Sequence, residues 1–314
     1  MLPAVAEPPA SDFFSTINLR VPPGFNFHRT ALSHGWCSLP PFRYGPDRKT
    51  LEYTFELLNG TIVHAMINGG KSALSIKLSA AKTLHSVDLR EIRELIRSCL
   101  RVDVDLSGLY NIANRHPSFR WIQKAGAGRL LRSPSAFEDA VKIICTTNCT
   151  WQLTTIMVTK IVRTAGKTAD GIHFAFPTPQ ALASLSEKDF RVRCSTGYRA
   201  PYLRELATRV ASGELPIERW RDVGIAAGEL EEQIRQVKGM GPYAAGNMLR
   251  LLGNYESLAL DSWVRSQYFQ LHSRGRKVSD AAIERRYREF GKWKGLIFWL
   301  DMTRSWHEGK FPAT

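Results

Sequence analysis

The stretch 229–265 constrains the fold of this chain more than any other part of its sequence. Apolar residues recur at helical spacing over 230–237, and a turn that contains Gly239 and Gly241 follows them. Two glycines at positions i and i+2 permit backbone angles that a side chain would forbid. Pro242 then suits the first turn of a second helix, where its missing N–H costs nothing. The pattern therefore predicts two helices joined by a tight hairpin.

The predicted hairpin has a backbone chemistry of its own. A glycine turn that leads into a helix presents free N–H groups at the positive end of the helix dipole, and this arrangement binds phosphate. Such contacts hold a nucleic-acid strand without reading its sequence. A plain helical hairpin in a helical protein fits the same pattern, and the turn alone does not decide between the two. The residues that we expect to contact a strand here are Lys238, Gly239, Met240, Gly241 and Ala244.

The charge balance favours an anionic partner. The 314 residues include 43 Lys and Arg against 29 Asp and Glu, which gives a net charge of +14. This excess predicts salt-sensitive binding to a polyanion, without saying which one. An acidic membrane surface is the competing partner, but we find no basic amphipathic helix and no apolar run of about 18 residues. The N-terminus also lacks the pattern of a signal peptide. We therefore expect a protein of the cytoplasm, nucleoid or nucleus that is not secreted and binds no membrane.

Cysteine and histidine spacing predicts no metal site. The five cysteines are scattered, which favours a reducing compartment. Cys145 and Cys149 lie one helical turn apart, but no second Cys or His pair has the spacing of metal ligands. The eight histidines show no ligand pattern either. We therefore expect no metal and no organic cofactor.

Composition and periodicity divide the chain into three parts. Residues 1–12 are rich in Pro and Ala, and we expect a disordered tail there. Over 13–83 the alternation of apolar and polar residues, with strong turn signals at 59–60 and 68–70, predicts an antiparallel β-domain. From 84 to 314 the period is helical, and this region is about three times larger. The expected strands of the meander are 51–58, 61–68 and 72–79, and the expected helices outside the hairpin are 87–101, 105–114, 136–145, 150–164, 180–185, 199–211, 262–271, 281–290 and 293–304.

Asp261 follows an apolar run at 258–260 and begins a new helical pattern, so its simplest role is to cap that helix. The whole segment 237–265 resembles the helix-hairpin-helix and aspartate signature of the endonuclease III superfamily of DNA glycosylases. Gly239-Met240-Gly241 matches the G-x-G hairpin of that family, and Leu258-Ala259-Leu260-Asp261 matches the segment with its catalytic aspartate. The combined motif, with the hairpin at about 229–252 and the catalytic loop at 253–265, is specific, whereas either half alone is not.

The resemblance implies a function and a fold. It implies a DNA glycosylase of base excision repair, which flips a damaged or mispaired base out of double-stranded DNA and hydrolyses its N-glycosidic bond. Asp261 is then the catalytic residue, as carboxylates are in glycoside hydrolysis. The implied fold is α+β and mostly α, with an N-terminal antiparallel β-domain and two helical subdomains that flank a DNA-binding cleft. The resemblance also implies a monovalent cation at the hairpin carbonyls, and we expect a monomer.

Tyr243 bears on the type of reaction. Family members that also cut the strand carry a nucleophilic lysine two residues after the second hairpin glycine, and this chain has Tyr243 there. A tyrosine cannot form the Schiff base with the sugar that the lyase step needs. The resemblance therefore points to the monofunctional branch, which leaves an abasic site.

Two further stretches extend the resemblance to the 8-oxoguanine and 3-methyladenine II glycosylases, which share the N-terminal β-domain. Residues 137–148 resemble the segment before their damage-facing loop, and 196–202 resembles their G-Y-R-A-x-Y segment. The match implies that Asn148 fills the gap left by the flipped base, that Tyr198 wedges between bases and that Arg199 reads the orphaned partner base. Without the resemblance, Asn148 also fits a helix C-cap and Tyr198 a core aromatic.

Departures from the family bear on the substrate. Leu153 stands where the 8-oxoguanine enzymes have a second arginine. Counted without gaps from Gly295, Phe298 and Met302 take the places of their guanine-reading glutamine and their stacking phenylalanine. These changes weaken 8-oxoguanine as the substrate. An aromatic pocket instead suits a cationic alkylated purine, although each aromatic also fits ordinary core packing. The expected pocket residues are Tyr243, Asn247, Trp263, Trp293, Phe298 and Met302.

Other functions stay open from the sequence. Tyrosine at the lysine position also resembles mismatch-specific glycosylases, so 8-oxoguanine and mispaired thymine, uracil or adenine remain alternative substrates. A non-catalytic module that binds DNA lesions is the main alternative of another class. An RNA-binding protein is a third, but the sequence has no aromatic motif of the RNA-binding type. An aspartate in register with an intact hairpin favours the enzyme.

Overall fold

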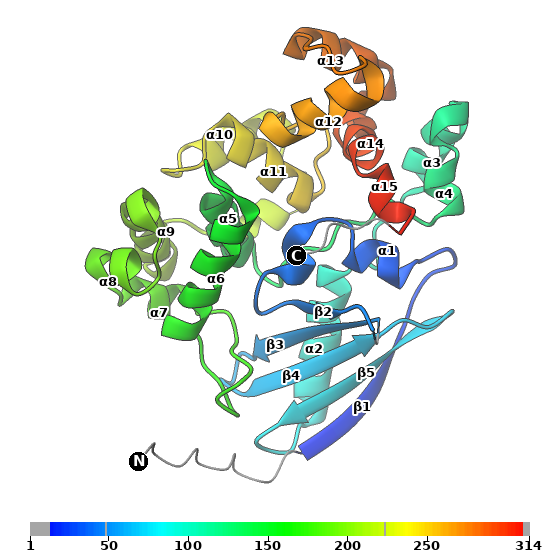
Figure 1. The fold of residues 1–314 in the computed structure, drawn as a ribbon. Helices are drawn as coiled ribbons and strands as arrows, with labels where there is room; N and C mark the ends of the chain where they lie inside the picture. Colours follow the sequence, from blue (N-terminus) through cyan, green and yellow to red (C-terminus); the bar gives the residue numbers. More distant parts are fainter. Residues whose placement is uncertain (1–12, 48, 223, 310–314) are drawn as a thin grey trace, which may run out of the picture.

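An antiparallel sheet of five strands forms the N-terminal part of the structure (Figure 1). The computed structural model describes residues 13–47, 49–222 and 224–309, so the tail expected at 1–12 lies outside the described residues. The strands run in the spatial order β1-β5-β4-β3-β2. Their bounds are β1 (Phe13–Arg20), β2 (Arg43–Gly45), β3 (Thr50–Glu56), β4 (Ile62–Asn68) and β5 (Ala73–Ala80).

The predicted meander is confirmed as β3, β4 and β5. Alternate residues of these strands point to opposite faces, and Leu51, Tyr53 and Phe55 of β3 all point into the core. Tyr53 pairs with Ala65 of β4, and Ala65 pairs in turn with Leu78 of β5. β1 pairs with β5 in the antiparallel direction along the whole length of both strands. Two short helical segments, α1 (Phe27–Ala31) and η1 (Gly35–Ser38), interrupt a region in which the sequence predicted only strands.

Helices make up the rest of the described chain, as predicted. None of them combines the length and the apolar character needed to cross a bilayer. The short helices α4, α8 and α15 were not predicted, whereas the longer ones lie close to their expected ranges. The bounds are α2 (Ser86–Cys99), α3 (Ser107–Asn114), η2 (Pro117–Phe119), α4 (Trp121–Lys124), α5 (Ala136–Thr146), α6 (Trp151–Ala165), α7 (Pro179–Ala183), α8 (Glu187–Val192), η3 (Gly197–Arg199), α9 (Ala200–Ala211), η4 (Ile217–Arg221), α10 (Ala227–Arg235), α11 (Pro242–Leu252), α12 (Ser262–His272), α13 (Asp280–Tyr287), η5 (Arg288–Trp293), α14 (Lys294–Met302) and α15 (Arg304–His307).

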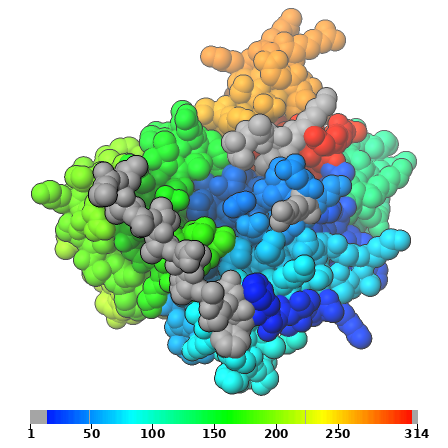
Figure 2. All heavy atoms as spheres, turned by 60° about the horizontal axis from the view of Figure 1, so that its bottom comes forward, coloured from blue at the N-terminus to red at the C-terminus, as the bar shows by residue number. Residues whose placement is uncertain are grey.

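The apolar interior consists of two clusters. The larger cluster joins the inner face of the sheet and α2 to α5, α6, α9, α10 and α11, whereas the smaller one joins α3 and α4 to α12, α13 and α14. The chain passes from the larger to the smaller cluster between Leu251 and Tyr255, in the loop that leads to Asp261. Strands give way to helices between Ala80 and Ser86, as expected, but the core of the sheet continues into the helical region. In Figure 2 the blue and cyan atoms of the N-terminal region lie beside the green atoms of the middle of the chain, and the orange atoms project at the top.

α5 connects the sheet to the helical region. Its residues 136–145 are all buried, and Ser135 caps it by accepting a hydrogen bond from the N–H of Glu138. The Glu138 carboxylate accepts a hydrogen bond of 2.6 Å from the Tyr53 hydroxyl on β3 and pairs at 2.7 Å with Lys142. Burial raises the pKa of Glu138, although Lys142 and Tyr53 act in the opposite direction. These polar groups are satisfied only when the sheet and α5 are both in place.

A second buried carboxylate on α5 joins three further segments. Asp139 accepts a hydrogen bond of 2.8 Å from the indole of Trp36 and one of 2.9 Å from the backbone of Ser133. The guanidinium of Arg221, in η4, lies 3.1 Å from its other oxygen. Asp139 thereby ties α5 to the segment of Trp36 and to η4.

The buried pair of Lys142 and Glu138 generates a stability prediction. Lys142→Met preserves the bulk of the side chain but leaves the Glu138 carboxylate without a cation. We expect the free energy of unfolding at neutral pH to fall by about 3–5 kcal/mol. Because protonation of Glu138 relieves the unpaired charge, the loss should shrink as the medium becomes mildly acidic. Denaturant titration at several pH values measures both effects. Lys160→Met, on the surface beside Ser195, is the control, and an equal loss in both variants would contradict this account.

Candidate active site

The predicted hairpin lies between α10 and α11, and only one of its two glycines needs to be glycine. Gly239 has φ +87°, and a Cβ there would lie 2.9 Å from a ring carbon of Tyr202. Gly241 has φ −68°, and a Cβ there would meet no atom within 4 Å. The expectation that both glycines adopt forbidden backbone angles is therefore wrong for Gly241. Its small size leaves the start of α11 open.

The start of α11 presents backbone rather than side chains. No side chain caps this helix, and Gly241 and Pro242 are exposed. The side chains of Met240 and Ala244 are buried, so a ligand here could contact only the backbone of these two residues. Lys238 is exposed, and its amine pairs with Glu205 at 2.7 Å. Such a surface pair is weak and leaves the lysine available to a stronger anion.

Asp261 is the N-cap of α12, the simplest role that its position in the sequence suggested. Its Oδ1 accepts a hydrogen bond of 2.7 Å from the N–H of Val264. Its Oδ2 has no hydrogen-bond partner among the described residues, and the side chain is only partly buried. The cap fixes the orientation of the carboxylate, and the second oxygen remains available to a ligand.

Tyr243 lies close to Asp261. Burial raises the pKa of the Tyr243 phenol, and the charge of Asp261 adds to this shift. A hydrogen bond with Thr146, the last residue of α5, lowers this pKa, and the nearby Cys149 raises it. The phenol therefore lies where the end of α5 meets the loop of Asp261, and it stays protonated at neutral pH.

Arg250 is a site residue that the sequence analysis missed. This buried side chain of α11 donates hydrogen bonds to the Leu258 carbonyl at 2.8 Å and to the amide oxygen of Asn247 at 3.2 Å. Burial lowers the pKa of Arg250 to about 10, against the opposing effects of Tyr243 and Asp261. Its positive charge therefore lies beneath the loop that carries Asp261. The one signal in the sequence was an arginine on an otherwise apolar helix face.

Three tryptophans form an aromatic wall next to Asp261. Trp263 is 37% exposed, and its ring lies 5.9 Å from that of Trp299 and 5.4 Å from that of Trp306. The guanidinium of Arg250 lies 4.8 Å from the centre of the Trp299 ring. Of the three, only Trp263 was predicted. Trp299 lies in α14 and Trp306 in α15, and their rings also contact each other, with centres 5.7 Å apart.

Two predicted pocket residues belong to the core instead. Phe298 is fully buried with its ring 5.1 Å from that of Tyr287, and Met302 is 2% exposed in the same cluster. Phe298 and Met302 share one face of α14. Trp299, the residue after Phe298, lies on a different face of the helix, where its ring contacts Trp263. The ungapped count from Gly295 therefore selected the core face of the helix, and the prediction was wrong for these two.

Two other expected pocket residues also have partners within the protein. Trp293 stacks on Tyr255, with ring centres 5.6 Å apart. Asn247 donates a hydrogen bond of 2.9 Å to the Tyr243 carbonyl and accepts one from Arg250. Its amide is therefore engaged along α11. Tyr243 and Trp263 lie near Asp261, and their role in a base pocket stays a prediction.

The structure brings Asn148 and Tyr198 together from different helices. Asn148 follows α5 with φ +47°, and its amide donates a hydrogen bond of 3.4 Å to the Tyr198 hydroxyl. Both side chains are exposed, and the C-cap of α5 is Thr147. The alternatives of a helix C-cap and a core aromatic are therefore wrong. Arg199 is buried, lies 4.5 Å below the Tyr198 ring and donates to the Thr147 carbonyl. It supports this pair here, and its reading of a base stays a prediction.

Known proteins are similar to this chain in sequence and in fold. No model of a known protein family matches the chain. A relative from Methanothermobacter thermautotrophicus named "Probable N-glycosylase/DNA lyase" is 26% identical over 302 residues, which cover 87% of this chain and 91% of the relative. The solved 3-methyladenine DNA glycosylase from Archaeoglobus fulgidus has a TM-score of 0.74 at 20% identity, over 92% of this chain and 98% of that one. The sequence relative and the structural neighbour are both DNA glycosylases, as the motif at 237–265 predicted.

A second solved glycosylase supports the same fold. The 8-oxoguanine glycosylase/lyase of Clostridium acetobutylicum, in complex with double-stranded DNA, has a TM-score of 0.67 at 19% identity. The match covers 95% of this chain and 98% of that one. The predicted resemblance to the helix-hairpin-helix superfamily of DNA glycosylases and the α+β fold with an N-terminal antiparallel sheet are thus confirmed.

The two hairpin glycines provide a matched pair of variants. Gly239→Ala forces a left-handed backbone angle on a residue with a Cβ and presses that atom against Tyr202. We expect it to lower the free energy of unfolding by about 1–3 kcal/mol. Gly241→Ala, which meets open space, should change it by less than about 0.5 kcal/mol. Chemical denaturation of the two variants measures the difference, and equal losses would argue against this hairpin geometry.

Proposed function

We propose that this protein is a monofunctional DNA glycosylase that removes an alkylated purine from double-stranded DNA and leaves an abasic site. The observation that carries the proposal is the pairing of Asp261 with Tyr243. The aspartate keeps one oxygen free beside a residue that takes the place of the family's lysine. Tyr243 lies in the first turn of α11, whose N-terminus has no side-chain cap and is exposed.

The hairpin and the pair of Asn148 and Tyr198 bind the DNA in this proposal. The free N–H groups at the start of α11 hold a phosphate of the damaged strand. Tyr198 replaces the stacking that is lost when the nucleotide leaves the helix, and Asn148 replaces lost pairing. Their exposure and mutual hydrogen bond support this role, because they form a rigid polar and aromatic tip.

Asp261 carries the chemistry. Cleavage of an N-glycosidic bond builds positive charge on the sugar, and a fixed carboxylate stabilises that charge. Its free Oδ2 also orients or deprotonates the attacking water. Arg250 supports this group in two ways: its hydrogen bond to the Leu258 carbonyl holds the loop, and its positive charge favours the ionised carboxylate.

The absence of a lyase step rests on Tyr243. The Schiff base requires an amine, and the Tyr243 phenol supplies none. The names of the relatives point in both directions, since two include a lyase activity and one does not. Three further predictions belong to this proposal. We expect a monovalent cation at the hairpin carbonyls, and we expect the protein to act as a monomer inside the cell.

The tryptophan wall supports an alkylated purine as the substrate. Such a base carries a positive charge that an electron-rich ring face attracts, and it departs without a protonating acid. Trp263, Trp299 and Trp306 offer such faces beside Asp261. A base such as 8-oxoguanine needs hydrogen bonds to its pairing edge, but the amide of Asn247 is engaged by Arg250.

A panel of duplexes with one lesion each tests the function. The lesions are a 3-methyladenine-type base, hypoxanthine, 8-oxoguanine, and uracil or thymine opposite guanine. Strand breaks that need alkali, in the alkylated-purine duplex, are the expected result. Breaks without alkali would overturn the monofunctional assignment, and breaks in another duplex would name another substrate. Tight duplex binding without breaks in any duplex would favour a lesion-binding module.

Asp261→Asn separates catalysis from folding. Asparagine caps a helix as well as aspartate does, so α12 should be preserved while the charge is lost. We expect excision to slow by about 100-fold or more, with duplex affinity retained. Single-turnover base release and fluorescence anisotropy measure the two quantities. Asp280→Asn removes another carboxylate at a helix start, one that pairs with Arg265, and it should excise at the normal rate. Excision by Asp261→Asn at the wild-type rate would refute the mechanism.

Tyr243→Lys tests the position of the missing nucleophile. An amine placed beside Asp261 should attack the sugar and form a Schiff base that borohydride traps on damaged DNA. The wild-type protein should give no trapped complex. Denaturing electrophoresis of labelled DNA reads out the result. Trapping by the wild type would mean that another amine performs the lyase step, and no trapping by the variant would count against the alignment of Tyr243 with the lysine.

A further inference from the structure

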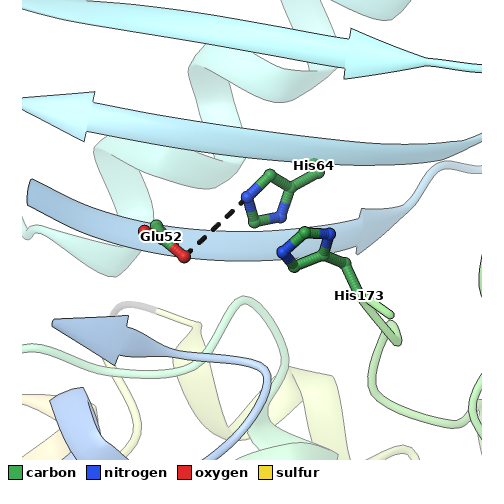
Figure 3. Close-up of side chains that lie close together, drawn as sticks. All are labelled: Glu52, His64 and His173. Atoms are coloured by element: carbon green, nitrogen blue, oxygen red, sulfur yellow. Dashed lines mark ion pairs between the residues drawn. The ribbon is translucent and has the colours of Figure 1, made fainter. Parts of the chain in front are cut away.

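Two histidines and a glutamate meet on the outer face of the sheet, away from the residues assigned to DNA. Glu52 lies on β3, His64 on β4 and His173 in the loop between α6 and α7 (Figure 3). One potential ligand atom of each residue lies within 4.8 Å of those of the other two. His64 Nε2 is 3.9 Å from Glu52 Oε2, and the two imidazoles stack with centres 3.9 Å apart.

Hydrogen bonds orient both imidazoles. The Nδ1 of His173 bonds to Asp170 Oδ2 at 2.6 Å, and the Nδ1 of His64 bonds to the Thr54 hydroxyl at 3.1 Å. The Nε2 atom of each ring is therefore the one left for a ligand. Metal-binding histidines are commonly held in this way, by a carboxylate or another acceptor on the second nitrogen.

The loop that carries His173 is itself well supported. Asp170 accepts hydrogen bonds of 2.8 and 2.7 Å from the backbone N–H groups of Ile172 and His173. Although burial opposes ionisation, the bonds from His173 and Ile172 lower the pKa of Asp170. Lys167, at the start of the loop, pairs with Glu56 of β3 at 2.5 Å. The loop thus rests against the sheet before any ligand is added.

One cation competes for the carboxylate of this site. The exposed guanidinium of Arg43 lies 3.7 Å from Glu52 Oε2 and is the one competing cation among the described partners of that carboxylate. Its long, solvated side chain can move aside at little cost.

We propose that Glu52, His64 and His173 bind a zinc ion that fastens the loop between α6 and α7 to the sheet. Two imidazole nitrogens and a carboxylate oxygen form a borderline-soft set that favours zinc over magnesium or calcium. Water fills the fourth position of the tetrahedron. The site stands on different residues from the proposed catalysis, so either can fail without the other. Sequence spacing could not reveal it, because the three ligands come from two strands and a distant loop.

Metal titration of the tag-free protein after chelator treatment tests this site. We expect one equivalent of zinc to bind by calorimetry and to raise the melting temperature. His173→Gln and His64→Gln should abolish this binding. Asp170→Asn, which removes only the support of His173, should weaken it by about 10- to 100-fold. His116→Gln is the control, because His116 also lies 3.9 Å from a glutamate, Glu289, outside the proposed site.

Cobalt(II) provides a readout that does not depend on stability. The intact site should give the absorption bands of four-coordinate cobalt in the wild type and in His116→Gln, and these bands should be absent from His173→Gln. Absence of stoichiometric zinc binding and of cobalt bands in the wild type would overturn the proposal. Equal binding by a folded His64→Gln, His173→Gln double variant would overturn it as well. If a variant fails to fold, the wild-type cobalt spectrum decides.

Discussion

The buried charges of α5 are the constraint on which the rest of the structure depends. Glu138, Asp139 and Lys142 all lie inside the protein, where an unpaired charge is very costly. Their partners come from the sheet, from the segment around Trp36 and from η4. Lys142 and Glu138 pair within α5, but Glu138 also bonds to Tyr53 of the sheet. Asp139 has further partners in Trp36 and Arg221, so α5 can be buried only together with these segments. This requirement explains why the apolar core runs without a break from the strands into the helices.

The position of α5 also determines where several residues of the candidate active site lie. Its C-terminal end brings Asn148 to Tyr198 on one side, and Thr146 to Tyr243 on the other. The loop of Asp261 joins the larger apolar cluster to the smaller one, and Arg250 holds that loop by its carbonyl. The candidate catalytic carboxylate is thus placed by contacts between two cores, and a loop held in this way keeps its geometry better than a free one.

Local patterns predicted a large part of the fold. The meander followed from alternation and from strong turn dipeptides, and the hairpin from two glycines followed by a proline. The same patterns located Asp261, because a cap followed by an apolar period is a local signal. Predictions failed where the relevant face of a helix had to be known to within one residue, as with Phe298 and Met302. Helical periodicity says which residues share a face, but not what that face meets.

The hairpin motif with Asp261, the strands and most of the helices follow from the sequence, because turn chemistry, capping and periodicity act between neighbours in the chain. The packing of the folded chain sets which distant groups meet. It placed Arg250 beneath the loop of Asp261 and Trp299 beside Trp263. It also brought His173 onto the sheet next to His64. These contacts join segments with no fixed spacing along the chain, and the packing of the two cores sets their distances.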